Sequence, residues 1–107
     1  MSEYTEYLQD VFALLGPIAA RRMFGGYGIY HDGAMFALVA DEVLYLKADA
    51  LNVGDFEREG LPAFEYVRQG RVVKLSYYQA PEVLFEDLEL ARDWARRSLA
   101  AARRANG

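Results

Sequence analysis

Few residues in this sequence have the types and the spacing that chemistry requires. His31 is the only histidine, and the chain has no cysteine, so neither a metal-ligand set nor a catalytic triad can be completed around it. His31 stands beside an Asp-Gly pair at 32–33, and we therefore favour a solvent-exposed turn residue over a catalytic one. The absence of cysteine also excludes disulfides and thiol catalysis. We expect no catalytic residue, no metal and no cofactor.

Three closely spaced glycines invite comparison with a phosphate-binding loop. Gly25, Gly26 and Gly28 could let backbone N–H groups contact an anion. Such loops lie between a strand and the N-terminus of a helix, whereas here the chain continues through 27–30 in a pattern typical of a strand. The sequence therefore favours a bend or bulge with close backbone packing. A small anionic ligand at this segment stays the least favoured alternative.

Aromatic residues are the most abundant candidates for a binding surface. Eight tyrosines and six phenylalanines could stack nucleobases while neighbouring arginines contact phosphates. Aromatic residues are also what strands prefer, and strand residues alternate between two faces. We therefore expect most of these rings in the core or at an interface formed by a sheet, with Phe64 and Tyr66 pointing the same way.

A run of arginines marks the last expected helix, over 87–105. At 100° per residue its apolar residues share one arc, and the arginines fall on the opposite side. We favour a solvated helix face near the negative end of the helix dipole. The alternative is a basic face that docks on an acidic partner or on phosphates through bidentate contacts. This basic helix face consists of Arg92, Arg96, Arg97, Arg103 and Arg104.

The overall charge argues against nucleic acid as the partner of the whole surface. The net charge is −4, from 12 Lys and Arg against 16 Asp and Glu, and such a field repels polyanions. The N-terminal MSEYTEYLQD is acidic and polar where a signal peptide needs a basic and then an apolar stretch, and no apolar run approaches the ~20 residues of a membrane span. We expect a cytoplasmic protein without a membrane partner.

The elements that must position these residues form one expected domain, 1–107. A helix capped by Ser2 runs to Gly16-Pro17, strands follow over 20–47 with a hairpin turn at Asp32-Gly33, and a short helix spans about 49–59. A second hairpin turns at Gln69-Gly70, and Asp87 caps the last helix. The fold class is α+β, an antiparallel sheet of about five strands flanked by an N-terminal and a long C-terminal helix, with a short helix between hairpins. The uncovered sheet face predicts a homodimer.

Several strings resemble a known family. RRMFGGYGIY from Arg21, MFALVADEVLYLK to Lys47 and FEYVRQGRVVKLSYYQAPE from Phe64 look like the N-terminal domain of the TfoX (Sxy) family of competence regulators, and RRMFGGYG and SYYxAPE are the most specific parts. The resemblance implies a bacterial cytoplasmic α+β protein that helps to switch on DNA-uptake genes, acting with the cyclic-AMP receptor protein at promoters rather than as a catalyst. As a common surface or scaffold it singles out Arg21, Arg22, Met23, Phe24, Gly25, Gly26, Gly28, Arg71, Ser76, Tyr77 and Tyr78.

Family regulators resemble two modules in series, whereas this chain ends after one. Our first hypothesis is a non-catalytic regulatory module that acts through protein contacts, with the transcription machinery or a regulator as its partner. A second is direct nucleic-acid binding through the arginines of the last helix and the Arg21-Arg22 pair. A small-ligand binder or enzyme at the glycine segment is the third.

Overall fold

The computed structural model describes residues 2–23 and 25–106, and it confirms the α+β class. The sheet is antiparallel, with the strand order β1-β2-β3-β4-β6-β5. It has six strands rather than about five, because the arginine-bearing segment before the glycines forms an edge strand of its own. The elements are α1 (Glu3–Val11), β1 (Ala19–Met23), β2 (Gly26–His31), β3 (Ala34–Ala40), β4 (Val43–Lys47), α2 (Val53–Arg58), β5 (Ala63–Arg68), β6 (Arg71–Gln79), η1 (Glu82–Phe85, a 3₁₀ turn) and α3 (Leu88–Asn106).

Tight turns join the paired strands. Asp32-Gly33 and Gln69-Gly70 both have positive φ at their two central residues, the backbone that two-residue hairpins require. The sequence prediction of these hairpins is therefore confirmed. A third turn of this kind, at Asp41-Glu42, also has positive φ at both residues although neither is glycine.

The helix boundaries follow local hydrogen bonds. Ser2 caps α1 through a reciprocal pair with Thr5, and the Asp87 carboxylate accepts from two backbone N–H groups at the start of α3, as expected. α1 ends at Val11, before the Gly16-Pro17 stop. α2 begins four residues later than predicted, because the buried Asn52 side chain binds backbone groups at both 47 and 49 and fixes the preceding loop.

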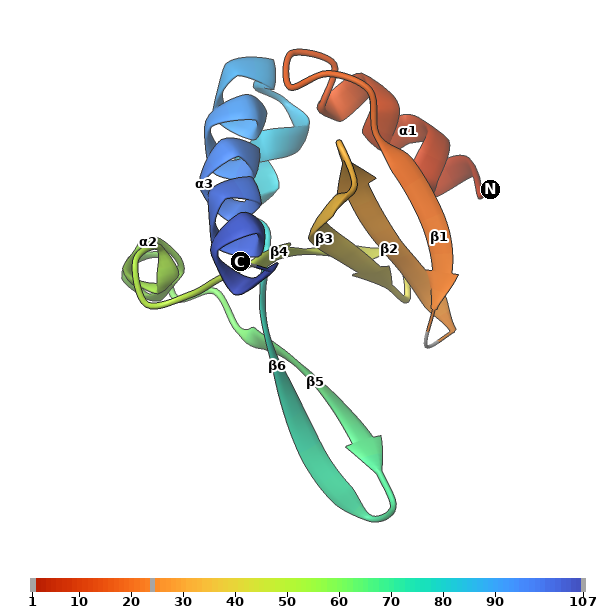
Figure 1. Cartoon of the computed structure of the whole chain (residues 1–107), viewed down its shortest axis with the longest axis vertical. Helices are drawn as coiled ribbons and strands as arrows, with labels where there is room; N and C mark the ends of the chain where they lie inside the picture. Colours follow the sequence, from red (N-terminus) through yellow and green to blue (C-terminus); the bar gives the residue numbers. More distant parts are fainter. Residues whose placement is uncertain (1, 24, 107) are drawn as a thin grey trace.

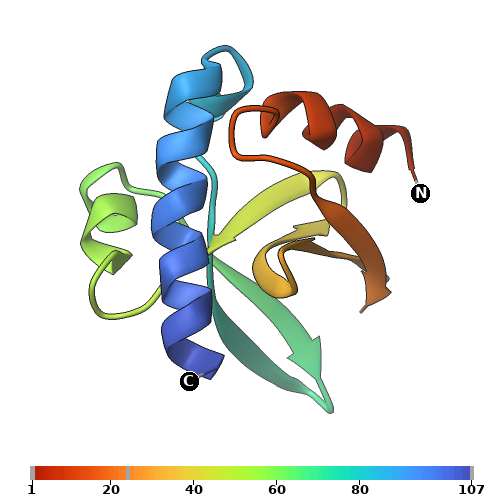
Figure 2. The ribbon, with the colours of Figure 1, turned by 45° about the horizontal axis from the view of Figure 1, so that its top comes forward.

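The helices cover one face of the sheet. Figures 1 and 2 show α3 between α1 on one side and α2 on the other. Phe12 meets Phe36 edge to face, with ring centroids 5.3 Å apart, and Phe56 packs against Tyr78 and Trp94 at 5.3 and 5.2 Å. The side of α3 that faces the sheet is formed mostly by small residues. The helical period predicts Ala91, Trp94, Ala95, Ser98, Leu99 and Ala102 there, and the structure adds Ala101. Leu88, at the first position of α3, is 45% exposed although it shares the predicted apolar arc.

The β5–β6 hairpin projects from the rest of the molecule. β4 pairs with β6 only through residues 45–47 and 77–79, so the remainder of the hairpin continues beyond the sheet, as Figure 1 shows. Its distal residues are mostly exposed. The hairpin therefore presents two side-chain faces to solvent. Separately, no helix within residues 2–23 and 25–106 combines the length and apolarity needed to cross a membrane.

Candidate interaction surfaces

The glycine segment is a packed corner of the sheet. A Cβ on Gly26 would overlap the carbonyl of Val39, and a Cβ on Gly28 would lie 2.7 Å from the Met23 sulfur. Gly25 has φ +76° with open space around it. The segment continues into β2 rather than into a helix, as expected for close backbone packing. Phe24, the remaining member of the motif here, lies outside the described residues.

The face of the sheet opposite the helices, here called the open face, carries rings and cations. Strand register places Arg21 opposite Gly28 and Lys47 opposite Tyr77. The Arg21 guanidinium lies 4.8 Å from the centre of the Tyr30 ring, and the Lys47 ammonium lies 5.2 Å from that of Tyr77. Both are cation–π contacts. The open face therefore holds its cations directly against aromatic rings.

The rings continue from the open face onto the hairpin. Tyr45 contacts Phe64 edge to face at 4.9 Å, and Phe64 stacks on Tyr66 at 6.0 Å. Phe64 and Tyr66 thus point the same way, as predicted. By strand alternation Arg68 and Arg71, which pair across the tip, lie on this same side of the hairpin.

Tyr77 is fixed in the open face. Its hydroxyl donates to the Met35 carbonyl at 3.4 Å. Burial, and secondarily the nearby Tyr30, raises the pKa of Tyr77 to about 12.

The raised pKa of Tyr77 has a consequence at alkaline pH. The unfolded tyrosine ionises near pH 10, so between pH 10 and 12 the unfolded state loses a proton that the folded state keeps, and the free energy of unfolding falls. We expect Tyr77→Phe to flatten this decline in urea titrations relative to the parent chain. Equal slopes in the Tyr77 variant and the parent would contradict this.

The arginines of α3 form two stripes rather than one face. At about 100° per residue, Arg97 and Arg104 lie about 20° apart, and the other three lie about 100° away from them. The Arg97 Nε is 3.1 Å from Asp55, and its guanidinium also covers Trp94 at 4.9 Å. Arg104 binds Asp49 with two nitrogens, at 2.6 and 2.9 Å. These two arginines therefore tie α3 to α2 and to the loop before it.

The other stripe consists of Arg92, Arg96 and Arg103. It resembles the solvated helix face that we favoured from the sequence. Arg92 meets its neighbour Asp93 at 3.2 Å. Within the described part of the chain, Arg96 and Arg103 make no ion pair or hydrogen bond. Of the five α3 arginines, all of which the structure describes, only these two therefore keep their charge without an ion-pair partner.

The Arg104–Asp49 pair predicts an acid-sensitive contact. The Arg104 hydrogen bond is the main cause that lowers the pKa of Asp49 to about 2. An unfolded aspartate titrates near 3.9, so the contact stabilises the fold above that pH and the stabilisation is lost as pH falls to 2. We expect Arg104→Gln to flatten the loss of stability between pH 5 and 2 in thermal melts. Arg103→Gln is the matched control, and the same flattening there would contradict the assignment.

The remaining motif residues do not form one surface. Tyr78 follows Tyr77 but points to the helix side, where it stacks on Phe56, because neighbouring strand residues alternate. Ser76 accepts a hydrogen bond from Lys47 at 2.5 Å, and Arg22 is exposed on β1. Among the described motif residues, the structure therefore unites Arg21, Met23, Gly28, Arg71 and Tyr77 on the open face, but not Arg22, Ser76 and Tyr78.

His31 has a structural role. Its Nδ1 donates to the Pro17 carbonyl at 2.7 Å, and its Nε2 is 3.3 Å from Asp32. Its side chain is only 12% exposed, so our expectation of a solvent-exposed residue is wrong, because the ring packs against the Gly16-Pro17 loop. Among the described residues no three His, Cys, Asp or Glu side chains gather in a way that could hold a metal ion.

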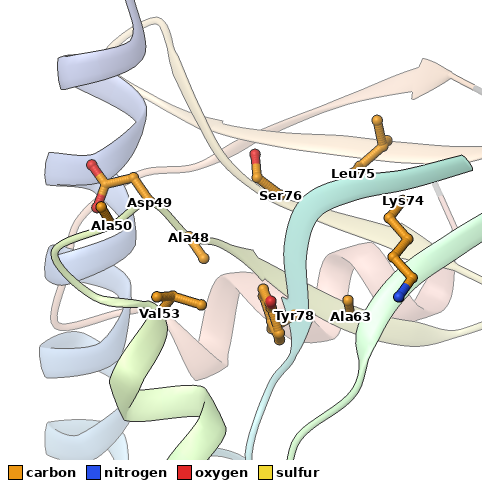
Figure 3. A pocket seen from close by; sticks show the side chains of 9 residues that line it. All are labelled: Ala48, Asp49, Ala50, Val53, Ala63, Lys74, Leu75, Ser76 and Tyr78. Atoms are coloured by element: carbon orange, nitrogen blue, oxygen red, sulfur yellow. The ribbon is translucent and has the colours of Figure 1, made fainter.

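The other side of the hairpin borders a groove of about 390 Å³. Figure 3 shows Val53 of α2 facing Tyr78 and Ala63 across it, with Lys74 at the hairpin side. The other lining residues are Ala48, Asp49, Ala50, Leu75 and Ser76. Further out on this side, by alternation, lie Val67 and Val72, direct cross-strand partners that are 71% and 63% exposed. Of this side, the sequence analysis singled out Ser76 and Tyr78 as motif residues, but not the groove or the exposed valine pair.

The fold and these surfaces define a small α+β domain whose six-stranded antiparallel sheet is covered by helices on one face only. The model of the TfoX N-terminal domain family matches residues 10–102, and the chain belongs to this family. The resemblance stated from the sequence is thereby confirmed.

Two curated relatives are similar to most of the chain. DNA transformation protein TfoX1 of Aliivibrio fischeri is 34% identical over 86 residues, which make up 80% of this chain and 41% of that protein. Protein Sxy of Escherichia coli K12 is 36% identical over 85 residues, which make up 78% and 41%. The chain thus spans about two fifths of the length of each relative.

Proposed function

We propose that this domain is a non-catalytic regulatory module of competence, the uptake of DNA, and that it acts in the cytoplasm through contact with a protein of the transcription machinery or a regulator. Membership of the TfoX N-terminal domain family supports this setting, and the name of the relative from Aliivibrio fischeri, a DNA transformation protein, supports the link to DNA uptake. The observation that carries the contact is the exposed cross-strand pair of Val67 and Val72 on the projecting hairpin.

An apolar pair at this place favours association. Valine side chains that stay 71% and 63% exposed are stabilised when another surface removes them from water, by up to about 1.5–3 kcal/mol for each side chain fully buried. The groove beside α2 lies on the same side of the hairpin and offers a partner side chain a mostly apolar lining. A projecting apolar element next to a groove is an arrangement suited to protein recognition.

Affinity capture from the native cytoplasm tests this function. The parent chain is expected to retain a transcription regulator or a polymerase subunit, and Val67→Thr/Val72→Thr, which adds two hydroxyls without changing charge or branching, is expected to retain at least tenfold less. Val83→Thr, at a 46% exposed valine of η1, is the control. Capture that recovers neither class of protein, or that is equal for all three chains, would contradict the proposal.

We also propose a homodimer, since a second copy can cover the same apolar hairpin side. Sedimentation at high concentration is expected to show a dimer for the parent and Val83→Thr chains and a monomer for the double-threonine variant. A parent that stays monomeric refutes it.

A further inference from the structure

Charge is segregated between the sheet and the rest of the molecule. The described strands contain six of the 12 Lys and Arg residues but only one of the 16 Asp and Glu residues, Glu65. Glu65 pairs with Lys74 at 3.6 Å on the groove side of the hairpin. The open-face positions of the strands therefore hold Arg21, Lys47, Arg68 and Arg71 without any carboxylate, in a chain whose net charge is −4.

The cations of the open face are interleaved with rings. Tyr30 and Tyr77 lie under Arg21 and Lys47, and the contacts from Tyr45 through Phe64 to Tyr66 lead toward the two arginines of the hairpin tip. The four tyrosines are half-buried. Rings that are held in place in this way, and the Arg21 guanidinium plane over Tyr30, can stack on flat groups without a large loss of side-chain entropy.

We propose that the open face binds single-stranded nucleic acid. The four cations would neutralise phosphates while unpaired bases stack on the rings and guanidinium planes, the combination that single-strand binding uses. A duplex keeps its base faces inside the helix and would use only the charges. An acidic protein segment would likewise leave the rings without a stacking partner. This site lies on the side of the hairpin opposite Val67 and Val72 and goes beyond the protein contact proposed above.

The net charge of the chain and the local charge of the open face affect nucleic-acid binding in opposite directions. The −4 of the whole chain lowers long-range attraction, so we expect binding to be strong only at low salt. For single strands the logarithm of the affinity falls with the logarithm of salt with a slope of about −0.7 for each phosphate neutralised. Four cations therefore predict a slope of about −3.

Fluorescence anisotropy with a labelled oligothymidylate tests the proposal between 50 and 200 mM salt. Arg68→Gln/Arg71→Gln is expected to reduce the steepness of the salt slope by about half. Tyr66→Leu is expected to weaken binding by about tenfold at unchanged slope, and Tyr66→Phe, which keeps the ring, is expected to restore it. Arg96→Gln/Arg103→Gln removes the same charge from α3 and is the matched control. Circular dichroism establishes that each variant is folded.

Four results would overturn the proposal. The first is no binding by the folded parent chain at 50 mM salt. The second is a loss of binding in the α3 control equal to that in the hairpin variant, which would move the contact to the helix. The third is equal binding by Tyr66→Leu and the parent together with full competition by polyglutamate, which would mean a general anion surface or an acidic protein partner. Tighter binding of a matched duplex would also contradict it.

Discussion

Replacing Gly26 with alanine is expected to lower the free energy of unfolding by about 3 kcal/mol. The added Cβ would overlap the Val39 carbonyl, and this is backbone in the middle of the sheet, so neither strand can move away without breaking its pairing. Urea denaturation of the purified chain measures the change. A loss of this size removes a large part of the stability typical of a domain.

The neighbouring glycines supply the controls for Gly26. At Gly28 the same methyl meets side chains rather than backbone, the flexible ends of Met23 and Met35 and the edge of the Tyr30 ring. At Gly25 it meets nothing but requires a positive φ. Both alanine variants are therefore expected to lose less than Gly26→Ala, about 1–2 kcal/mol. Three equal losses would show that close approach to β3 is not what requires glycine at 26.

Phe56→Ala is expected to cost about 4 kcal/mol. Phe56 is fully buried and is the side chain on which both Tyr78 of β6 and Trp94 of α3 pack. Its loss leaves a cavity between these two rings in the core. Because Tyr78 anchors β6 on the helix side, the loss also weakens what holds Tyr77 on the open face.

Denaturant titration with two further variants checks this result. Phe56→Leu keeps most of the volume and is expected to lose less than half as much. Val67→Thr, on the exposed hairpin, is expected to change stability by less than about 0.5 kcal/mol. A Phe56→Ala chain as stable as the parent would contradict the central place of this ring in the core.

Local features such as turns could be predicted from the sequence, whereas pairings between distant segments could not. Asp32-Gly33 and Gln69-Gly70 were predictable because positive φ is a property of the turn itself. The open face depends on the pairing of β4 with β6, which joins Lys47 to Tyr77 across thirty residues. Alternation already predicts that Tyr77 and Tyr78 point to opposite faces, but only that register shows which of the two lies beside Lys47 on the open face.

The arginines of α3 illustrate the same limit. The helical period placed them away from the core, as the structure bears out for the helix as a whole. It could not show that Arg97 and Arg104 meet Asp55 and Asp49, because those carboxylates come from a segment more than forty residues earlier. The exposed valine pair gave no sequence signal either, since alternation alone does not distinguish a covered strand from a projecting one.

Transcription in cells tests the regulatory role most directly. DNA-uptake genes are measured in a strain that lacks this chain and is complemented with the parent, with Val67→Thr/Val72→Thr or with Val83→Thr. We expect the parent and Val83→Thr to restore expression, whereas the Val67→Thr/Val72→Thr chain, present at the same level, does not. Equal expression with and without the chain, or full restoration by the double-threonine chain, would contradict it.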